Sequence, residues 1–176
     1  DQATLTRGPH GMNEGSRDEP IRAPEQSTEE AQREIIEEFG YFDDWMQRYQ
    51  YIIDLGRKLS EFPNEWRCAA CQLQGCQSQV WLKGETHGNR LRFHAMSDSA
   101  IVSGLISLLL RVYNDRTPEE ILRTQPGFVA EIGLDKHLSP TRNNGLAAMI
   151  KAIQSHALQA MTRAAEGDVG QKHDGG

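Results

Sequence analysis

Three cysteines within nine residues are the side chains of this sequence with the clearest chemical potential. They are Cys68, Cys71 and Cys76. A deprotonated thiol is a nucleophile, a metal ligand and a partner in disulfide exchange, so this cluster predicts sulfur, metal or redox chemistry. The start of the chain lacks the charged-then-apolar pattern of a secretory signal. Together with the odd number of cysteines, this favours free thiols in the reducing cytoplasm.

Cys76 stands just before a segment with strand character. Gly75 precedes it, Gln77 and Ser78 follow it, and the apolar residues 80–82 come next. Gly75 permits unusual backbone dihedrals and the close approach of another protein, while Gln77 and Ser78 carry donors for a sulfur anion. The pattern predicts a reactive thiol presented on a loop, although the same residues also fit a buried structural cysteine.

The cysteine spacing also permits a metal site or a redox pair. Cys68-x2-Cys71 is half of a common zinc site, which Cys76 and either His87 or His94 would have to complete. The same pair has the spacing of a redox dithiol, and oxidation could also join either thiol to Cys76. A three-cysteine metal or iron–sulfur scaffold therefore remains the alternative function. A third interpretation is that Cys68 and Cys71 are loop thiols without a role.

A second polar cluster occupies residues 138–146. Ser139 and Pro140 are typical of a helix start, which puts Arg142 in the first turn, where the helix dipole disfavours a cation. A cation in this place is either a functional charge or a solvated surface arginine.

Composition argues against several classes of function. The net charge of −6 argues against non-specific nucleic-acid binding, which needs a basic face to displace counterions. No apolar run approaches the ~20 residues of a membrane-spanning helix. The sequence shows no phosphate-binding glycine loop and no histidine spaced to activate Cys76 for hydrolysis.

The elements that must position these residues are two helical blocks on either side of one strand pair. Apolar periodicity and capping signals predict helices over residues 28–39, 42–59, 100–113 and 118–123, a helical turn over 128–132, and a long last helix from 140. Ser97 is the predicted cap of the helix over 100–113. Strands are predicted over 79–83 and 90–96, joined by a turn over 84–89, with an irregular loop over 62–75. This order predicts an α+β fold with a small antiparallel sheet packed against helices.

The chain is predicted to fold as a single domain over residues 27–166. Residues 1–26 are rich in Gly, Pro, Arg, Glu and Ser without apolar periodicity, which predicts a disordered extension, and residues 1–11 could be an artificial addition. Residues 167–176 are predicted to form a disordered tail because glycine and charged residues dominate them.

Three motifs in this order resemble the SufE family of sulfur-acceptor proteins, which includes the CsdE proteins. The motifs are Gly75-Cys76-Gln77-Ser78-Gln79-Val80-Trp81, Ser97-Asp98-Ser99-Ala100-Ile101-Val102-Ser103-Gly104-Leu105-Ile106, and Leu138-Ser139-Pro140-Thr141-Arg142-Asn143-Asn144-Gly145-Leu146. Residues 51–56 also look like the early helix of the family, and the resemblance covers about residues 35–160.

The resemblance implies a fold similar to the iron–sulfur scaffold protein IscU, with Cys76 as the sulfur-accepting residue. Cys76 would take persulfide sulfur from a pyridoxal-phosphate-dependent cysteine desulfurase of the SufS or CsdA type and stimulate that enzyme. It would then pass the sulfur to an assembly complex of the SufBCD type, with no metal or organic cofactor on this chain. Asp98 and Arg142 match family positions and are expected to shape the surface around the Cys76 loop. Cys68 and Cys71 lie outside the family pattern.

Overall fold

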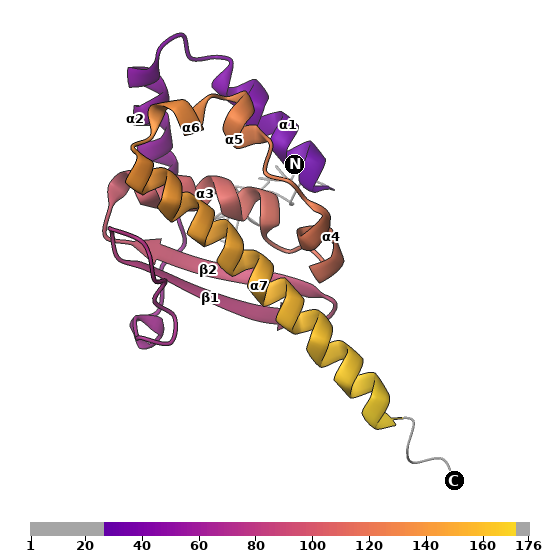
Figure 1. Cartoon of the computed structure of the whole chain (residues 1–176). Coiled ribbons are helices and arrows are strands. Elements are labelled where there is room, and N and C mark those ends of the chain that lie inside the picture. The colour runs from indigo at the N-terminus through magenta and orange to yellow at the C-terminus, as the bar shows by residue number, and fades with distance from the viewer. Residues whose placement is uncertain (1–26, 172–176) are drawn as a thin grey trace, which may run out of the picture.

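The computed structural model describes residues 27–171, which form helices packed on one face of a two-stranded sheet (Figure 1). The elements are α1 (Thr28–Phe39), α2 (Trp45–Gly56), the 3-10 turn η1 (Asn64–Trp66), β1 (Val80–His87), β2 (Arg90–Ser97), α3 (Ala100–Tyr113), α4 (Pro118–Arg123), α5 (Phe128–Glu131), α6 (Leu134–His137) and α7 (Pro140–Gln171). The predicted α+β class is confirmed. The predicted disorder of residues 1–26 lies outside the described residues.

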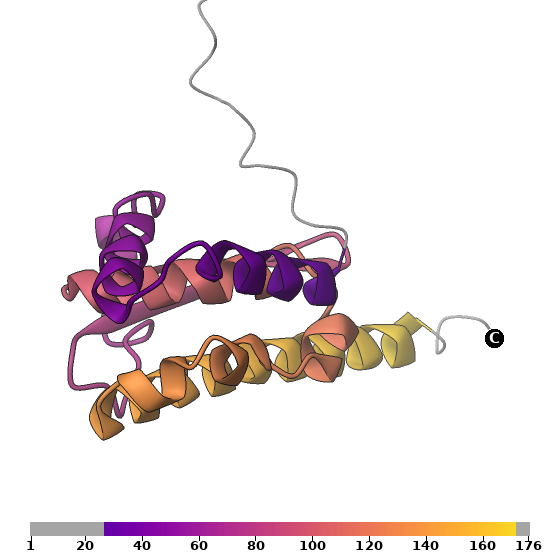
Figure 2. The ribbon, with the colours of Figure 1, turned by 90° about the horizontal axis from the view of Figure 1, so that it is seen from above.

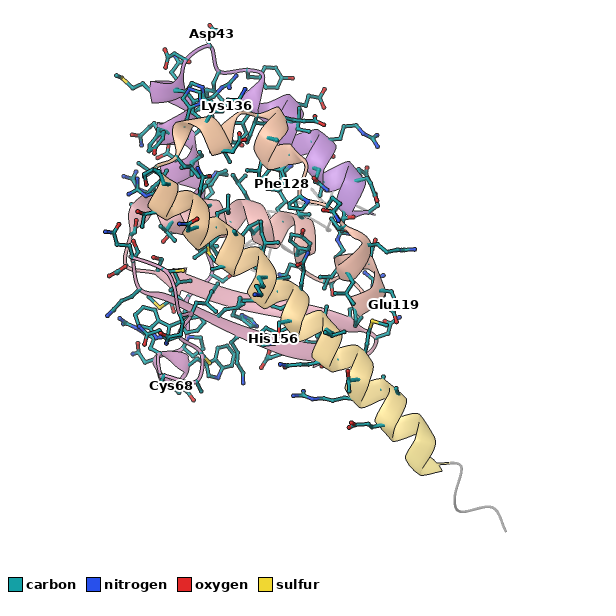
Figure 3. The ribbon with its side chains drawn as sticks, in the orientation of Figure 1. Asp43, Cys68, Glu119, Phe128, Lys136 and His156 are labelled. Atoms are coloured by element: carbon teal, nitrogen blue, oxygen red, sulfur yellow. The ribbon has the colours of Figure 1, made fainter. Side chains whose placement is uncertain are left out.

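The sheet is one antiparallel hairpin whose strands are longer than predicted. Val80 pairs with Ser97 at one end and His87 with Arg90 at the other, so Gly88 and Asn89 alone form the turn. The prediction of a turn over residues 84–89 is wrong, because Gly84 serves packing rather than chain reversal. Helix α7 crosses the strands at His156 (Figure 3). A Cβ atom at Gly84 would lie 2.9 Å from Nδ1 of His156, so only glycine leaves room for this side chain.

The core lies between the sheet and the helices that cover its apolar face. Val80 and Leu82 of β1 and Phe93 of β2 point into it, and α3 is buried over most of its surface. Seen from above, α1, α2 and α3 form one row, and α7 forms a second row with α4, α5 and α6 beside it (Figure 2). The site residues of both halves of the sequence therefore meet where α3, α7 and β1 converge.

Two glycines let α2 and α3 approach until their backbones touch. A side chain at Gly104 would collide with the Ile52 carbonyl oxygen, and a Cβ atom at Gly56 would lie 2.6 Å from the Gly104 amide nitrogen. Any larger residue at these positions would push the two helices apart. This contact sets the position of α3, and α3 lies beside the loop of Cys76.

Three helix starts follow the predicted capping chemistry, and the start of α3 does not. The hydroxyls of Ser27, Thr117 and Ser139 each accept a hydrogen bond from the backbone N–H three residues further on. The cap of α3 is Ser99, however, and not Ser97 as predicted. Ser97 is still paired with β1, and its hydroxyl accepts from the Ser99 N–H instead.

The bounds of α2 and α7 also differ from the prediction. Helix α2 is shorter than the predicted 42–59, because Asp44 caps it and accepts from the Gln47 N–H at 2.8 Å. Helix α7 continues past Gly167 to Gln171, where the sequence predicted a tail. A single glycine costs a helix only about 1 kcal/mol, which is too little to end it. Residues 172–176 lie outside the described residues.

Candidate functional site

Cys76 lies in a short loop that is closed at its base by the backbone. The Leu73 N–H donates to the Val80 carbonyl oxygen at 2.8 Å, and Gln72 forms an isolated antiparallel bridge with Trp81. Gly75 has a φ of +85°, in the left-handed region that favours glycine, and a Cβ atom there would meet nothing within 4 Å. The side of the loop before Cys76 is therefore open to an approaching molecule.

The Cys76 side chain lines a cavity of about 210 Å³ between the loop, α3 and the first turns of α7. The apolar part of the wall comes from three elements and consists of Val80, Val102, Leu105, Leu146 and Met149. The polar part consists of Gln77, Ser78, Ser139, Thr141 and Arg142. The polar side chains of the wall come from two of the three sequence motifs, those around Cys76 and Arg142. The third motif, at the start of α3, contributes only apolar side chains.

Cys76 is half-buried, and its surroundings favour the neutral thiol. Burial raises the pKa of the Cys76 thiol above its ordinary value. The thiol lies 4.0 Å from the Gly145 carbonyl oxygen, to which it donates a weak hydrogen bond. At rest the sulfur is consequently a protonated, sheltered thiol rather than an exposed thiolate.

Arg142 supplies the positive charge of the cavity. Its backbone N–H donates to the Ser139 cap, and its side chain lines the cavity together with Cys76. Among residues 27–171 its guanidinium has no hydrogen-bond or ion-pair partner. The cation and the N-terminus of α7 therefore both favour a negative charge in this cavity.

Asp98 positions the loop instead of lining the cavity. Its carboxylate accepts a hydrogen bond from the Gln79 N–H at 3.0 Å, and its own N–H donates to the Gln79 carbonyl oxygen at 3.3 Å. These two bonds hold the segment between Cys76 and β1 against the end of β2. Gln77 and Ser78 contribute to the cavity wall, and among the described residues neither hydrogen-bonds to the neutral thiol of the resting state.

Cys68 and Cys71 belong to a separate place in the fold. They occupy the turn that follows η1, with Cys68 exposed and Cys71 partly buried. In the part of the chain that the structure describes, no three His, Cys, Asp or Glu side chains gather as metal ligands. The structure thus does not assemble the alternative three-cysteine metal site.

Sequence reasoning missed that Gly145 lies beside the sulfur. Gly145 is buried, and a Cβ atom built there would lie 3.8 Å from Cys76 Sγ. The signal was a glycine inside a predicted helix, which usually marks a close packing contact. Its partner could not be named, because the two residues are 69 positions apart in the sequence.

The family of the chain follows from comparison with known proteins. The model of the SufE family, described as an Fe-S metabolism associated domain, matches residues 33–157. The chain belongs to the SufE family. This match confirms the resemblance seen in the three motifs, and it associates this SufE protein with iron–sulfur metabolism.

Two curated relatives support the assignment. An uncharacterized SufE-like protein of Rhizobium meliloti (strain 1021) is 40% identical over 129 residues, covering 70% of this chain and 92% of the relative. Another uncharacterized SufE-like protein, from Rhizobium etli, is 38% identical over 129 residues, covering 70% of this chain and 87% of the relative. Both relatives are at least 38% identical to this chain and are covered over most of their own length, which supports membership of the SufE family.

A solved structure shares the fold. The solution structure of a hypothetical protein from Thermus thermophilus superposes with a TM-score of 0.63 at 22% identity, covering 75% of this chain and 96% of that one. Within residues 27–171, no helix combines the length and the apolar character needed to cross a bilayer.

Proposed function

We propose that this SufE protein accepts persulfide sulfur on Cys76 from a cysteine desulfurase. The observation that carries the proposal is that Cys76 lines a cavity whose wall also includes Arg142 and the start of α7. A persulfide adds one sulfur atom and, when ionised, one negative charge. The cavity offers volume for the first and a favourable potential for the second.

The volume of the cavity suits a small inorganic cargo. A sulfur atom is similar in size to a water molecule, whose share of liquid volume is about 30 Å³. The cavity of about 210 Å³ holds that atom without displacing Val102 or Leu105 from the wall. The partial burial of Cys76 also limits the access of other thiols, which would otherwise remove the sulfur by exchange.

The transfer itself is an exchange between two sulfur centres. The Cys76 thiolate attacks the outer sulfur of the persulfide on the desulfurase, and a new S–S bond forms at Cys76 Sγ. The S–S bond on the desulfurase breaks, and its cysteine leaves as a thiolate that takes up a proton. The outer sulfur changes carrier without a net redox change, and its removal frees the desulfurase for another turnover. This is the basis on which we expect stimulation of the enzyme.

The attack requires Cys76 to leave its resting position. Its thiol is neutral and faces Gly145 at rest, whereas the nucleophile must be ionised and must reach the partner. The open surroundings of Gly75 let the loop turn outward when a desulfurase docks. A bulky alkylating reagent should therefore modify Cys76 faster when the desulfurase is present. Equal rates with and without it would contradict the loop movement.

We assign the partners by the same chemistry. The donor is a pyridoxal-phosphate-dependent cysteine desulfurase of the SufS or CsdA type, and the receiver is an assembly complex of the SufBCD type. We place the exchange in the cytoplasm, because a carrier with three free thiols requires a reducing compartment.

Intact mass spectrometry tests the sulfur-accepting role directly. The protein is incubated with a cysteine desulfurase and free cysteine in the absence of reductant. Wild type should gain one sulfur atom that maps to Cys76, the Cys76→Ser variant should gain none, and the Cys68→Ser, Cys71→Ser double variant should load as wild type. No gain on wild type, with a desulfurase shown to be active, would overturn the proposal.

A further inference from the structure

Cys68 and Cys71 form the two ends of a hydrogen-bonded turn. The Cys71 N–H donates to the Cys68 carbonyl oxygen at 3.1 Å, and the Gln72 N–H donates to the same oxygen at 3.2 Å. Such a turn brings the Cα atoms of its first and fourth residues within about 7 Å, and disulfides span Cα separations of about 4.4–6.8 Å. The backbone therefore already holds the two cysteines at a spacing that a disulfide can bridge.

The two thiols differ in exposure, and the Cys68 side chain is close enough to act on the Cys71 thiol, whose pKa it raises. Cys68 is exposed at the outer edge of its loop, below the strands in Figure 3, whereas Cys71 is partly buried. This arrangement gives one thiol that meets solution and a second, less exposed thiol at the other end of the same turn.

One positive side chain, Lys83, acts on the pair. Burial and the neighbouring Cys68 raise the pKa of the Cys71 thiol, and the Lys83 ammonium opposes that rise. Lys83 lies 5.8 Å from the centre of the Trp66 ring, and Arg67 lies 5.0 Å from that of Trp81. Of these two cations, Lys83 acts on the Cys71 thiol and offsets part of the rise in its pKa, so it favours the Cys71 thiolate needed for the second step.

The turn keeps its shape without a cross-link. The Leu82 N–H of β1 donates to the Cys71 carbonyl oxygen at 2.8 Å, and the bridge between Gln72 and Trp81 follows directly. The chain on the far side of Cys71 is thus fixed to the sheet. A disulfide between Cys68 and Cys71 would close on a backbone that is already in place.

Two competing chemistries fit the geometry less well. A metal ion would find only two thiolates here, because residues 27–171 provide no third side chain of a ligand type at this place. A disulfide with Cys76 would have to draw that sulfur out of the α7 cavity, away from the Gly145 carbonyl oxygen. The pairing of Cys68 with Cys71 requires neither.

We propose that Cys68 and Cys71 are a redox-active dithiol, distinct from the Cys76 site, that a small disulfide of the glutathione class converts into an intramolecular disulfide. The Cys68 thiolate attacks the small disulfide, forms a mixed disulfide and releases one small thiol. The Cys71 thiolate then attacks the Cys68 sulfur, and the second small thiol leaves. The protein loses two electrons and two protons, and the glutathione-class disulfide gains both as two thiols.

The test exposes the reduced full-length protein to oxidised glutathione and follows it by intact mass and peptide mapping. Wild type and Cys76→Ser should each lose two hydrogens, with the new bond mapped between Cys68 and Cys71. The Cys71→Ser variant lacks the second thiol, so the glutathione adduct on Cys68 should accumulate at least about tenfold above its level in wild type. Titration in glutathione buffers of graded ratio should return a single two-electron transition in wild type.

Three results would overturn the inference. They are a wild-type disulfide that includes Cys76, a glutathione adduct that persists on wild-type Cys68, and stoichiometric zinc binding by the reduced pair that blocks the reaction. The experiment contains no desulfurase. Its failure therefore leaves the sulfur-accepting role of Cys76 standing, and loss of that role would leave the dithiol standing.

Discussion

The Cys76 loop and the Cys68–Cys71 turn place the same kind of side chain in opposite surroundings. Cys76 points into a cavity between α3 and α7, where burial raises the pKa of its thiol. Cys68 lies exposed in the turn that follows η1, and Cys71 is partly buried three residues further on, where Lys83 acts on its thiol. Cys76 follows Cys71 closely in the sequence. The hydrogen bond between Leu73 and Val80 closes a loop that contains Cys76 and leaves Cys71 outside it.

This contrast shows how a fold assigns separate chemistries to neighbouring thiols. A carrier of labile sulfur needs enclosure, because any accessible thiol can remove its cargo. A thiol that senses small disulfides needs exposure and a partner within reach. Backbone hydrogen bonds at the base of the Cys76 loop separate the two places. One short segment can therefore hold an enclosed thiol at Cys76 and an exposed thiol at Cys68.

Replacing Cys76 by Ser should have the largest effect and should separate the roles of the two cysteine regions most clearly. The variant should lose sulfur loading by at least about 100-fold, to background, because a hydroxyl is a far weaker nucleophile than a thiolate at neutral pH. The double variant Cys68→Ser, Cys71→Ser should keep wild-type loading within about twofold, since neither thiol lines the cavity. Intact mass after desulfurase treatment measures both. Comparable losses in the two variants would show that the regions act as one site.

Filling the cavity from α7 should have the next largest effect. In Gly145→Val the added methyl groups crowd Cys76 Sγ and occupy space that the incoming sulfur requires, so loading should fall about tenfold. In the matched variant Gly145→Ala the new Cβ atom lies 3.8 Å from Sγ, an ordinary contact. That variant should load normally and gain about 0.5–1 kcal/mol in the free energy of unfolding, because alanine favours a helix interior. Loading by Gly145→Val at the wild-type rate would argue that the cavity does not hold the sulfur.

Removing the charge of Arg142 should have a smaller effect. In Arg142→Met the lifetime of the loaded sulfur against a competing thiol should shorten about three- to fivefold, consistent with a partly exposed charge near a helix end. Arg142→Lys keeps the charge and should recover most of that lifetime. Both are measured by the decay of the sulfur adduct by mass spectrometry, with the Cys68–Cys71 disulfide reaction as an internal control. Equal decay in wild type and Arg142→Met would remove Arg142 from the site.

The smallest effect should appear in the pH dependence of stability. Burial keeps the Cys76 thiol protonated in the folded state, so its folded pKa lies above its unfolded pKa. Its contribution to stability is fully present below the unfolded pKa and is lost as the pH rises through the folded pKa. Between those values wild type should therefore lose slightly more stability than Cys76→Ser in chemical unfolding under reducing conditions. Parallel alkaline profiles would contradict the shifted pKa.

Local sequence patterns predicted most of the helices and both strands of this molecule. Ser27, Thr117 and Ser139 were recognisable caps, because capping depends only on residues within three positions. Gly84 misled the strand prediction, since its reason for being glycine is His156, which is distant in sequence. Ser97 misled the cap prediction, because its pairing with β1 is a tertiary contact.

The candidate site was predictable only in its loop. The Gly75-Cys76 pair, followed by strand residues, indicated where a reactive sulfur would lie. The cavity itself depends on α7 arriving beside β1 and α3, and no local pattern states which helix does so. Arg142 was visible as a misplaced cation, but its position beside Cys76 required the structure.

The hydrogen bond between Leu73 and Val80 also sets the length of the arm that carries the sulfur. Cys76 is three residues from Leu73, and an extended chain advances about 3.3–3.6 Å per residue, so the arm spans about 10 Å at full stretch. A donor cysteine recessed further than this below the surface of its own protein would stay out of range. The desulfurase must consequently bring its sulfur close to its surface, or admit the body of this protein into the mouth of its active site.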